Sequence, residues 1–589
     1  MKENINKSLS RYHPKNNFIV LVVSLLVLLS LLPQILMAIS KDTNTVLGTV
    51  YGRVTDEEGI GIPAVLRFIS PESDIFETHY TDWLGGFELH LPATRYTIEI
   101  MHGPEYEIAR SSFNLAPNEK KKLTFSLSRL YDLSKIGWFG GDAHLHSSYS
   151  DGSDDVALVA LAAISNGLSW AFLTDHNTVE GHSEWLAARR FLLPSTFLEQ
   201  KQQFIAIPGE EITTELGHFN VAGNRELVGW TPAKGSEDLK RIFSEAVLKS
   251  SITIVNHPCA PDNLGYKNWE LINFFNALEV WNGRYPPYMM ENYEAMSFWF
   301  ELLNQGMKIA GISGTDCHDI TGEPYGSLSM ALSNVIIDYF PISSDFFDEH
   351  EAEFRSWFRS GLYPGNPRVY VNTPVLNEFN VLGALSRGNC FITNGPLVLV
   401  NIDDKGPGEV IPVIETKKLE LDIKIMSNQP LSKIIIIQGG RIVKEKNLAG
   451  LTDYVTKVDI DPNIGDWIIV QVFGNYPLFA MTNPIYLDSD VQEVTSKVKI
   501  IGPESTLIYN GSVKVVSKTP NAMNALIQAC IISGNSWREM GGLVVEIAGY
   551  EMQKSAGWMY EVNGEIPTVG AKDYFLKDGD EVVWYWSSW

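Results

Sequence analysis

The sequence predicts a multidomain protein in which a barrel of strand and helix units is flanked by modules built mainly of β-strands. With 589 residues the chain is too long for a single hydrophobic core. Between residues 135 and 410, short apolar runs alternate with segments of helical character, which favours parallel strands joined by helices. The regions on either side mostly alternate β-rich runs with turn residues.

Residues 1–40 have the composition of an export signal. Basic residues up to Lys15 precede an uncharged apolar stretch that begins at Phe18, and the small residues Ala38 and Ser40 suit signal cleavage. The stretch 18–39 is also long enough to span a bilayer of about 30 Å, so a cleaved form and a membrane-anchored form both stay open. In either case we expect the rest of the chain outside the cytoplasm.

Residues 45–130 are expected to form a small β-sandwich. Short β-rich runs such as LGTVYGRVTD and RYTIEIM are separated by turn residues. The region resembles the carboxypeptidase regulatory-like domain, a transthyretin-like sandwich. The resemblance rests on residues 52–56, 81–82 and 86–87 and on Tyr96. The resemblance implies a spacer or a binding module, because no cluster of catalytic residue types lies in this region.

The residues that carry chemistry begin after an apolar strand that ends in DAHLH. His144 and His146 alternate along this strand, so their side chains share one face. Because a lone His-x-His is also common at the polar edge of a strand, it needs further support. More than half of the twelve histidines lie between 144 and 318. The further members of this group are His176, Glu210 with Glu211, His218, His257, and Asp316 with His318.

Helical segments such as DDVALVALAAISNG and SEDLKRIFSEAVLKS separate the apolar runs. When polar residues follow successive parallel strands, closure into a barrel brings them to one mouth. Imidazole and carboxylate are the usual ligands of zinc, manganese and iron, so this convergence predicts metal binding. The alternative is that these histidines are buried in the core and hydrogen-bonded to the neighbouring acids without any metal. This interpretation becomes harder to sustain with each further residue in the group.

Composition and missing motifs disfavour several other classes. The net charge of −24 is spread without long runs of one sign, so no basic face is available to follow a phosphate backbone. The four cysteines contain no Cys-x-x-Cys, which excludes a disulfide framework and a cysteine-based zinc site. The chain also lacks the motifs of serine esterases, P-loop nucleotide hydrolases and His-Glu-x-x-His zinc proteases.

Six segments between residues 135 and 410 resemble the polymerase and histidinol phosphatase (PHP) superfamily. They are DAHLHSSYSDG, FLTDHN, IPGEEITT, GHFN, VNHP and SGTDCHD. Within this superfamily they are most similar to metallohydrolases of the CehA/McbA type, over about residues 135–410. The resemblance implies a distorted seven-stranded (β/α) barrel with two or three divalent ions of manganese, zinc or iron. It assigns one ion to His144, His146, Glu211 and Asp316, a second to Glu211, His218 and His257, and a third to Asp151, His176 and His318.

Two details of the ligand set stay open in the sequence. Glu211 is preferred to Glu210 as the shared ligand because members of the family usually contain Gly-x-Glu. Asp151 lies in the loop SYSDGS, where an aspartate is also common simply as a turn residue. Four further polar residues could support the ligands, although a polar residue in such a loop needs no special role. They are His182, Asn177, Glu279 and Asn282.

The resemblance implies hydrolysis of a small-molecule ester by hydroxide, which metal ions supply by lowering the pKa of water toward about 7. Phosphomonoesters or phosphodiesters are the default substrates, and carbamates or carboxylic esters are the alternative. Two other classes stay open: a surface-binding protein with an inactive barrel, and a nuclease. The acidic charge makes a nucleic-acid partner unexpected, and the oligomeric state is undetermined.

The remaining sequence predicts two further modules. Residues 411–496 contain β-rich runs such as KIIIIQGGRIV and are expected to form another β-sandwich. Residues 497–589 resemble a transcobalamin-like (DUF4430-type) domain, which implies a small α+β fold. The resemblance does not imply corrinoid binding. Its aromatic residues could face a ligand, although packing between strands is their commoner role; they are Trp558, Trp584, Tyr585 and Trp586.

Overall fold

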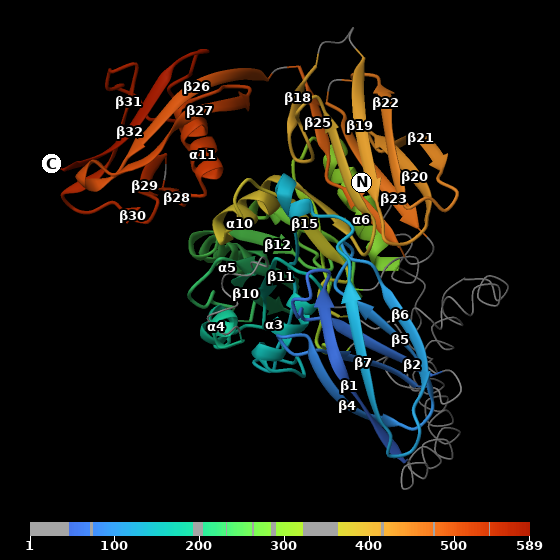
Figure 1. Ribbon diagram of the computed structural model, residues 1–589. Coiled ribbons are helices and arrows are strands. Elements are labelled where there is room, and N and C mark those ends of the chain that lie inside the picture. The colour runs from blue at the N-terminus through green and yellow to red at the C-terminus, as the bar shows by residue number, and fades with distance from the viewer. Residues whose placement is uncertain are drawn as a thin grey trace, which may run out of the picture. The chain divides into compact units, whose positions relative to one another are not determined.

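The computed structural model describes residues 46–70, 75–192, 204–230, 232–261, 264–283, 290–321, 363–413, 418–463, 465–474, 478–489, 491–540 and 542–588. They form a multidomain, strand-rich protein with few helices (Figure 1). The predicted export signal over 1–40 lies outside the described residues. No helix in the described part of the chain is long and apolar enough to cross a membrane.

The region predicted as the first β-sandwich contains two sheets. Strands β4, β1 and β7 form one in that order, and β3, β2, β5 and β6 form the other. Tyr96, Ile98 and Ile100 alternate with more exposed residues along β5, as expected for a strand buried on one face. The strands are β1 (Leu47–Asp56), β2 (Val65–Ser70), β3 (Ile75–Tyr80), β4 (Gly86–Pro92), β5 (Arg95–Met101), β6 (Ala109–Asn114) and β7 (Lys120–Leu127).

The chain divides into two compact units. Among the described residues, the smaller comprises 46–52, 88–96 and 112–123, and the larger comprises those that lie within 53–87, 97–111 and 124–588. All residues of the predicted metal centre, from His144 to His318, belong to the larger unit. The site is therefore built within that unit alone.

Seven neighbouring strands carry the predicted metal centre. They are β8 (Trp138–Asp142), β9 (Trp170–Leu173), β10 (Ile205–Thr214), β11 (Gly217–Ala222), β12 (Ile252–Val255), β13 (Ala277–Asn282) and β14 (Ala310–Gly314), adjacent in that order. Just beyond β8 and β14, Leu145 and Cys317 form a parallel bridge, so the first and last of these strands also meet. Helical elements precede or connect these strands. They are η2 (Leu133–Ile136), α3 (Val156–Ser165), α4 (His182–Leu192), α5 (Ser236–Lys249), η4 (Trp269–Phe274) and α6 (Met290–Asn304).

The regular alternation of parallel strands and helices breaks at β11, which runs antiparallel to β10 and β12. Glu215 and Leu216 alone separate β10 from β11, whereas parallel neighbours need a crossover of about a dozen residues. The Thr214 hydroxyl donates to the Gly217 carbonyl and closes this turn. The described strands therefore do not show a regular (β/α)7 barrel; they belong to a 15-stranded sheet.

The same sheet continues across residue 410, where the second β-sandwich was predicted to begin. Beyond β8 it runs through β15, β16, β24, β23, β20 and β21, while β17, β19 and β22 form a separate sheet. Trp467 and Met481 share a hydrophobic cluster with Trp170. The elements are β15 (Arg368–Asn372), α10 (Glu378–Arg387), β16 (Cys390–Thr393), β17 (Leu397–Ile402), β18 (Val410–Pro412), β19 (Leu419–Met426), β20 (Leu431–Gln438), β21 (Arg441–Asn447), β22 (Asp453–Ile460), β23 (Trp467–Gly474), β24 (Phe479–Thr482) and β25 (Ile485–Asp488).

The described part of the C-terminal region contains one α-helix and two small sheets. Asn521 caps α11 by accepting from the N–H of Asn524, and Gly534 ends it in a left-handed conformation. Trp558 and Trp584 are buried in the local core, which agrees with packing between strands. The elements are β26 (Gln492–Ile501), η5 (Pro503–Ser505), β27 (Leu507–Ser517), α11 (Ala522–Ser533), β28 (Trp537–Met540), β29 (Leu543–Ile547), β30 (Tyr550–Glu551), β31 (Ala556–Val562) and β32 (Glu581–Ser588).

Candidate metal centre

All nine predicted ligands lie at one end of the seven strands. His144 and His146 follow β8, and most of the others likewise lie at or beyond the end of a strand. His218 is the second residue of β11; because that strand is antiparallel, its start lies where its parallel neighbours finish. The remaining ligands at this end are Asp151, His176, Glu211, His257, Asp316 and His318.

The most buried group consists of His144, His146, Glu211 and Asp316. The Nε2 atoms of His144 and His146 lie 3.1 and 3.2 Å from Glu211 Oε2. The same two atoms lie 3.3 and 3.1 Å from Asp316 Oδ1. All four ligand atoms fall within 4.8 Å of one another, a spacing that fits one divalent ion.

Glu211 also faces a second group through its other oxygen. Its Oε1 lies 3.1 Å from His218 Nδ1 and 3.3 Å from His257 Nε2. His176 Nδ1 lies 3.2 Å from Oε2. The compact set of ligand atoms here is His176, Glu211 and His218, whereas the sequence assigned His257 to this ion and His176 to another. His176 therefore stands between two groups.

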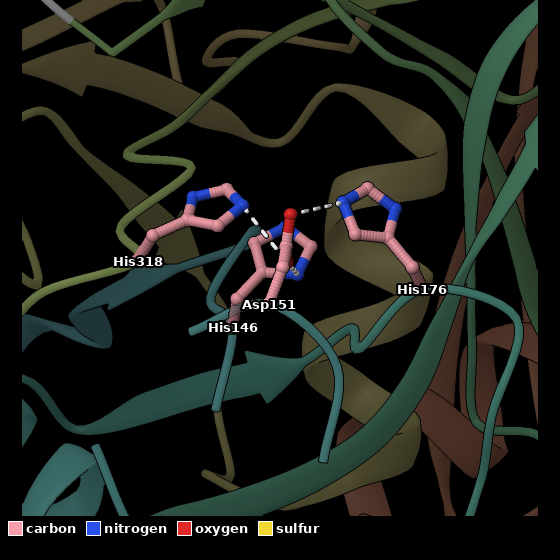
Figure 2. Close-up of side chains that lie close together, drawn as sticks. All are labelled: His146, Asp151, His176 and His318. Carbon is pink, nitrogen blue, oxygen red and sulfur yellow. Dashed lines mark ion pairs between the residues drawn. The ribbon is translucent and has the colours of Figure 1, made fainter. Parts of the chain in front are cut away.

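The third group faces solvent. Figure 2 shows the Asp151 carboxylate beside the rings of His146, His176 and His318. Asp151 lies 3.1 Å from His318 Nε2 and 3.5 Å from His176 Nε2. The side chains of Asp151, His318 and His176 are 58%, 36% and 23% exposed, whereas that of His146 is fully buried. The three groups thus lead from the interior of the protein to its surface.

Opposite charges dominate the electrostatics of the buried group. Burial would lower the pKa of His144, but the carboxylates of Asp316, Glu279 and Glu211 raise it well above its usual value. Burial also opposes protonation of His146, yet Asp316 and Glu211 raise its pKa to about 9. Burial would raise the pKa of Glu211, and its histidine neighbours lower it well below its usual value. Because a metal ion competes with these protons, metal binding is expected to release protons.

The two adjacent glutamates of β10 make different contacts. Glu211 faces the histidines, whereas Glu210 accepts from the N–H of Val228 at 3.0 Å. Burial raises the pKa of Glu210 to about 8, which favours the neutral carboxyl group over the carboxylate that a metal ion would need. The structure therefore brings Glu211, and not Glu210, to the other ligands, as preferred from the sequence.

A buried asparagine orients the shared carboxylate. Asn256 donates to Glu211 Oε1 and to Asn220 Oδ1, both at 2.9 Å. Asn256 was not among the predicted site residues. It directly precedes His257 at the end of an apolar run, and a polar residue next to a ligand at a strand end is the signal that could have found it.

A buried aspartate holds the loop that carries Asp151. Asp175 accepts from the N–H and the hydroxyl of Ser147, both at 2.7 Å, and from the hydroxyl of Ser150 at 2.8 Å. It was also missed, although it directly precedes His176 at the end of an apolar run. These hydrogen bonds fix the loop without occupying the Asp151 carboxylate.

The four residues with weaker sequence support take different positions. Glu279 lies 2.8 Å from His144 Nδ1 and accepts from the Asn282 side chain. His182 instead contacts the Gly209 carbonyl at 2.7 Å, and Asn177 donates to the Thr213 carbonyl. Asn177 contacts Glu211 only through its backbone N–H, so Glu279 is the member of this set whose side chain contacts the side chain of a predicted ligand.

The donor chemistry of the three groups fits divalent metal binding. Every donor in them is an imidazole nitrogen or a carboxylate oxygen. Both ring nitrogens of His146 are buried and make no hydrogen bond with the described residues, although Nε2 faces two carboxylates. A buried polar atom without a partner costs about 1–3 kcal/mol. A bound ion would give His146 a partner.

One family model matches the C-terminal end of the chain, and several solved structures are similar to parts of the chain. The family described as a domain of unknown function (DUF4430) matches residues 520–588, inside the region expected to be transcobalamin-like. The structure of haptocorrin in complex with Cbi is similar over 17% of this chain and 26% of that one, with 16% identity and a TM-score of 0.15. No curated protein matches the chain.

Two further solved structures are similar over longer stretches. One is a two-domain protein from Bacteroides vulgatus that contains a predicted PHP-like metal-dependent phosphoesterase; the match covers 64% of this chain and 95% of that one, with 16% identity and a TM-score of 0.31. The other is a candidate metal-dependent phosphoesterase from Bifidobacterium adolescentis, with 31% and 89% covered, 15% identity and a TM-score of 0.22. Similarity to the CehA/McbA type stays a prediction from the sequence.

Proposed function

We propose that the protein is a metal-dependent hydrolase that acts on small-molecule esters. The observation that carries the proposal is the convergence of three His and carboxylate groups, which share Glu211, His146 and His176. Isolated buried groups of this kind would be costly, and shared ligands are what a multinuclear centre requires. Two or three divalent ions of zinc, manganese or iron would be held by His144, His146, Asp151, His176, Glu211, His218, His257, Asp316 and His318.

With divalent ions bound, the arrangement would supply the parts that ester hydrolysis needs. Bound divalent ions lower the pKa of water toward about 7 and stabilise negative charge on a leaving oxygen. Glu211 and Asp316 stay ionised because neighbouring histidines lower their pKa values. The exposed group around Asp151 is where a substrate would enter, since it is the part of the site open to solvent.

A phosphomonoester or phosphodiester is the proposed substrate class. This choice follows the motif resemblance between residues 135 and 410, and a carbamate or carboxylic ester is the alternative that the same motifs carry. We further propose that the protein acts outside the cytoplasm, because of the basic and apolar leader over 1–40.

The test measures metal content and hydrolysis on the full chain. Metal is quantified by mass spectrometry, and p-nitrophenyl phosphate, bis-p-nitrophenyl phosphate and 1-naphthyl methylcarbamate are offered with and without zinc or manganese. We expect two or three ions per chain and metal-dependent cleavage of a phosphoester. His176→Ala should lose both activity and metal, since this ring stands between two groups.

His90→Ala is the matched control. It makes the same substitution at an exposed histidine of β4, outside the metal centre. Its activity and metal content should equal those of the unaltered protein. Cleavage of the carbamate alone would move the substrate class to the alternative. A metal-free and inactive protein would refute the hydrolase proposal and favour a binding protein.

A further inference from the structure

Glu279, in β13, is buried between predicted ligands of two different ions. Its exposed fraction is 1%, and both of its oxygens accept hydrogen bonds. Oε1 faces His144 Nδ1 at 2.8 Å. Oε2 accepts from the backbone N–H of His257 and from the Asn282 side chain, each at 2.9 Å. One carboxylate therefore contacts a ligand of the first predicted ion and a ligand of the second.

The contact with His144 selects which ring nitrogen can bind metal. A carboxylate oxygen only accepts, so Nδ1 of His144 carries the hydrogen. The lone pair of the neutral ring is then on Nε2, which lies 3.1 Å from Glu211 Oε2 and 3.3 Å from Asp316 Oδ1. A carboxylate that accepts from the other nitrogen of a histidine ligand fixes both its tautomer and its orientation.

The contact with His257 holds an unusual backbone conformation. His257 has a φ of 23°, and residues other than glycine rarely adopt positive φ values. Its N–H donates to Glu279 Oε2 rather than to a strand neighbour. The hydrogen bond therefore helps to keep the His257 ring within 3.3 Å of Glu211 Oε1.

The space around this contact is closely packed. Gly314, in β14, has no side chain, and a Cβ atom there would lie 2.5 Å from both Glu279 Oε1 and His144 Cβ. Real Cβ atoms do not approach other atoms so closely. A glycine at this position lets the carboxylate and the imidazole come together.

We infer that Glu279 is a positioning residue that sets the geometry of His144 and His257, and so tunes the affinity of the first two ions but not of the third. The inference rests on the proposed function, because it assumes that the ligands bind metal. Asp151 and His318 are predicted ligands of the third ion alone, and they lie beside each other. Among the hydrogen bonds of the described residues, Glu279 contacts neither of them.

The test is Glu279→Gln in the full chain. Glutamine has nearly the same size but only one acceptor oxygen, so either His144 or the pair His257 and Asn282 must face its NH₂ group. We expect about 10- to 100-fold weaker binding of at least one of the first two ions. Zinc content is measured by mass spectrometry after equilibration in chelator buffers of graded free zinc, which resolves tight from weak ions without an activity assay.

Glu210→Gln is the matched control, because it makes the same substitution at a buried glutamate on the opposite face of β10, whose carboxyl group accepts from the N–H of Val228. Its zinc isotherm should be unchanged. If Glu279→Gln does not fold by circular dichroism, Glu279→Asp is measured instead, since its shorter side chain cannot reach both partners. An unchanged isotherm, or an equal loss of all ions from a folded variant, would overturn the inference. An unaltered protein without zinc or manganese would overturn the proposed function instead.

Discussion

Acid is expected to destabilise the protein through His102, a buried histidine outside the metal centre. His102 is 2% exposed, its Nδ1 lies 3.1 Å from the Ser165 carbonyl, and its ring lies edge-on to Tyr106. Burial lowers the pKa of this imidazole from 6.5 to about 4. The folded protein therefore holds the neutral ring, whereas the unfolded chain binds a proton at a higher pH.

The sign and size of the effect follow from this difference. A histidine with a lowered pKa in the folded state stabilises the fold above pH 6.5, and this stabilisation is lost as the pH falls from 6.5 to about 4. At about 1.4 kcal/mol per pH unit, the loss amounts to about 3 kcal/mol of unfolding free energy. Below about pH 4 both states are protonated at this site, and the contribution becomes constant.

The assay compares the unaltered protein with His102→Gln between pH 4 and 8. Native-state hydrogen exchange of peptides from β5 and α3 reports the free energy of opening around the substituted ring. We expect the stability difference between the two proteins to shrink by about 3 kcal/mol toward pH 4. Groups that titrate equally in both proteins cancel in this difference. Parallel pH profiles would refute the reasoning.

Three further outcomes follow from the metal centre. Glu211→Gln should lose the two ions that share this carboxylate while Glu210→Gln keeps them, as judged by metal content; equal loss would contradict the separation of the two glutamates. Asp175→Asn should weaken the ion beside Asp151 by about 10- to 100-fold in a zinc titration, and an unchanged isotherm would contradict its role in the loop. Chelation should lower the unfolding free energy by about 2.7 kcal/mol for each ion present at 100 times its Kd, seen as a lower Tm; an unchanged Tm would argue against bound metal.

The convergence of the candidate ligands was predictable, because most of them lie in or beside a short apolar run that the sequence marks as a strand. His144 and His146 alternate just after a short apolar strand, and two imidazoles on one face there are well suited to hold a metal ion. The order of the strands then follows their order in the chain. The direction of β11 could also have been predicted, since two residues between strands allow a hairpin and exclude a helical crossover.

No local sequence pattern indicates that the sheet continues beyond residue 410. The continuation depends on the pairing of β16 with β24, in which Phe391 is opposite Thr482. These residues are far apart in the sequence, and their apolar alternation suits several partners equally well. Local patterns therefore predicted the strands of this region but not the sheet that they join.

The supporting residues were the least predictable part of the site, and the reason is physical. Imidazole pairs in a strand are rare enough to indicate a ligand, but a buried glutamate or asparagine in an apolar strand has many uses. Glu279 gains its role only from what surrounds it: His144 on a different strand, the N–H of His257 in a left-handed conformation, and the missing side chain of Gly314. None of these conditions can be read from the neighbours of Glu279 in the sequence. The identity of a metal ligand is thus largely a local property of the chain, whereas its orientation is a property of the folded packing around it.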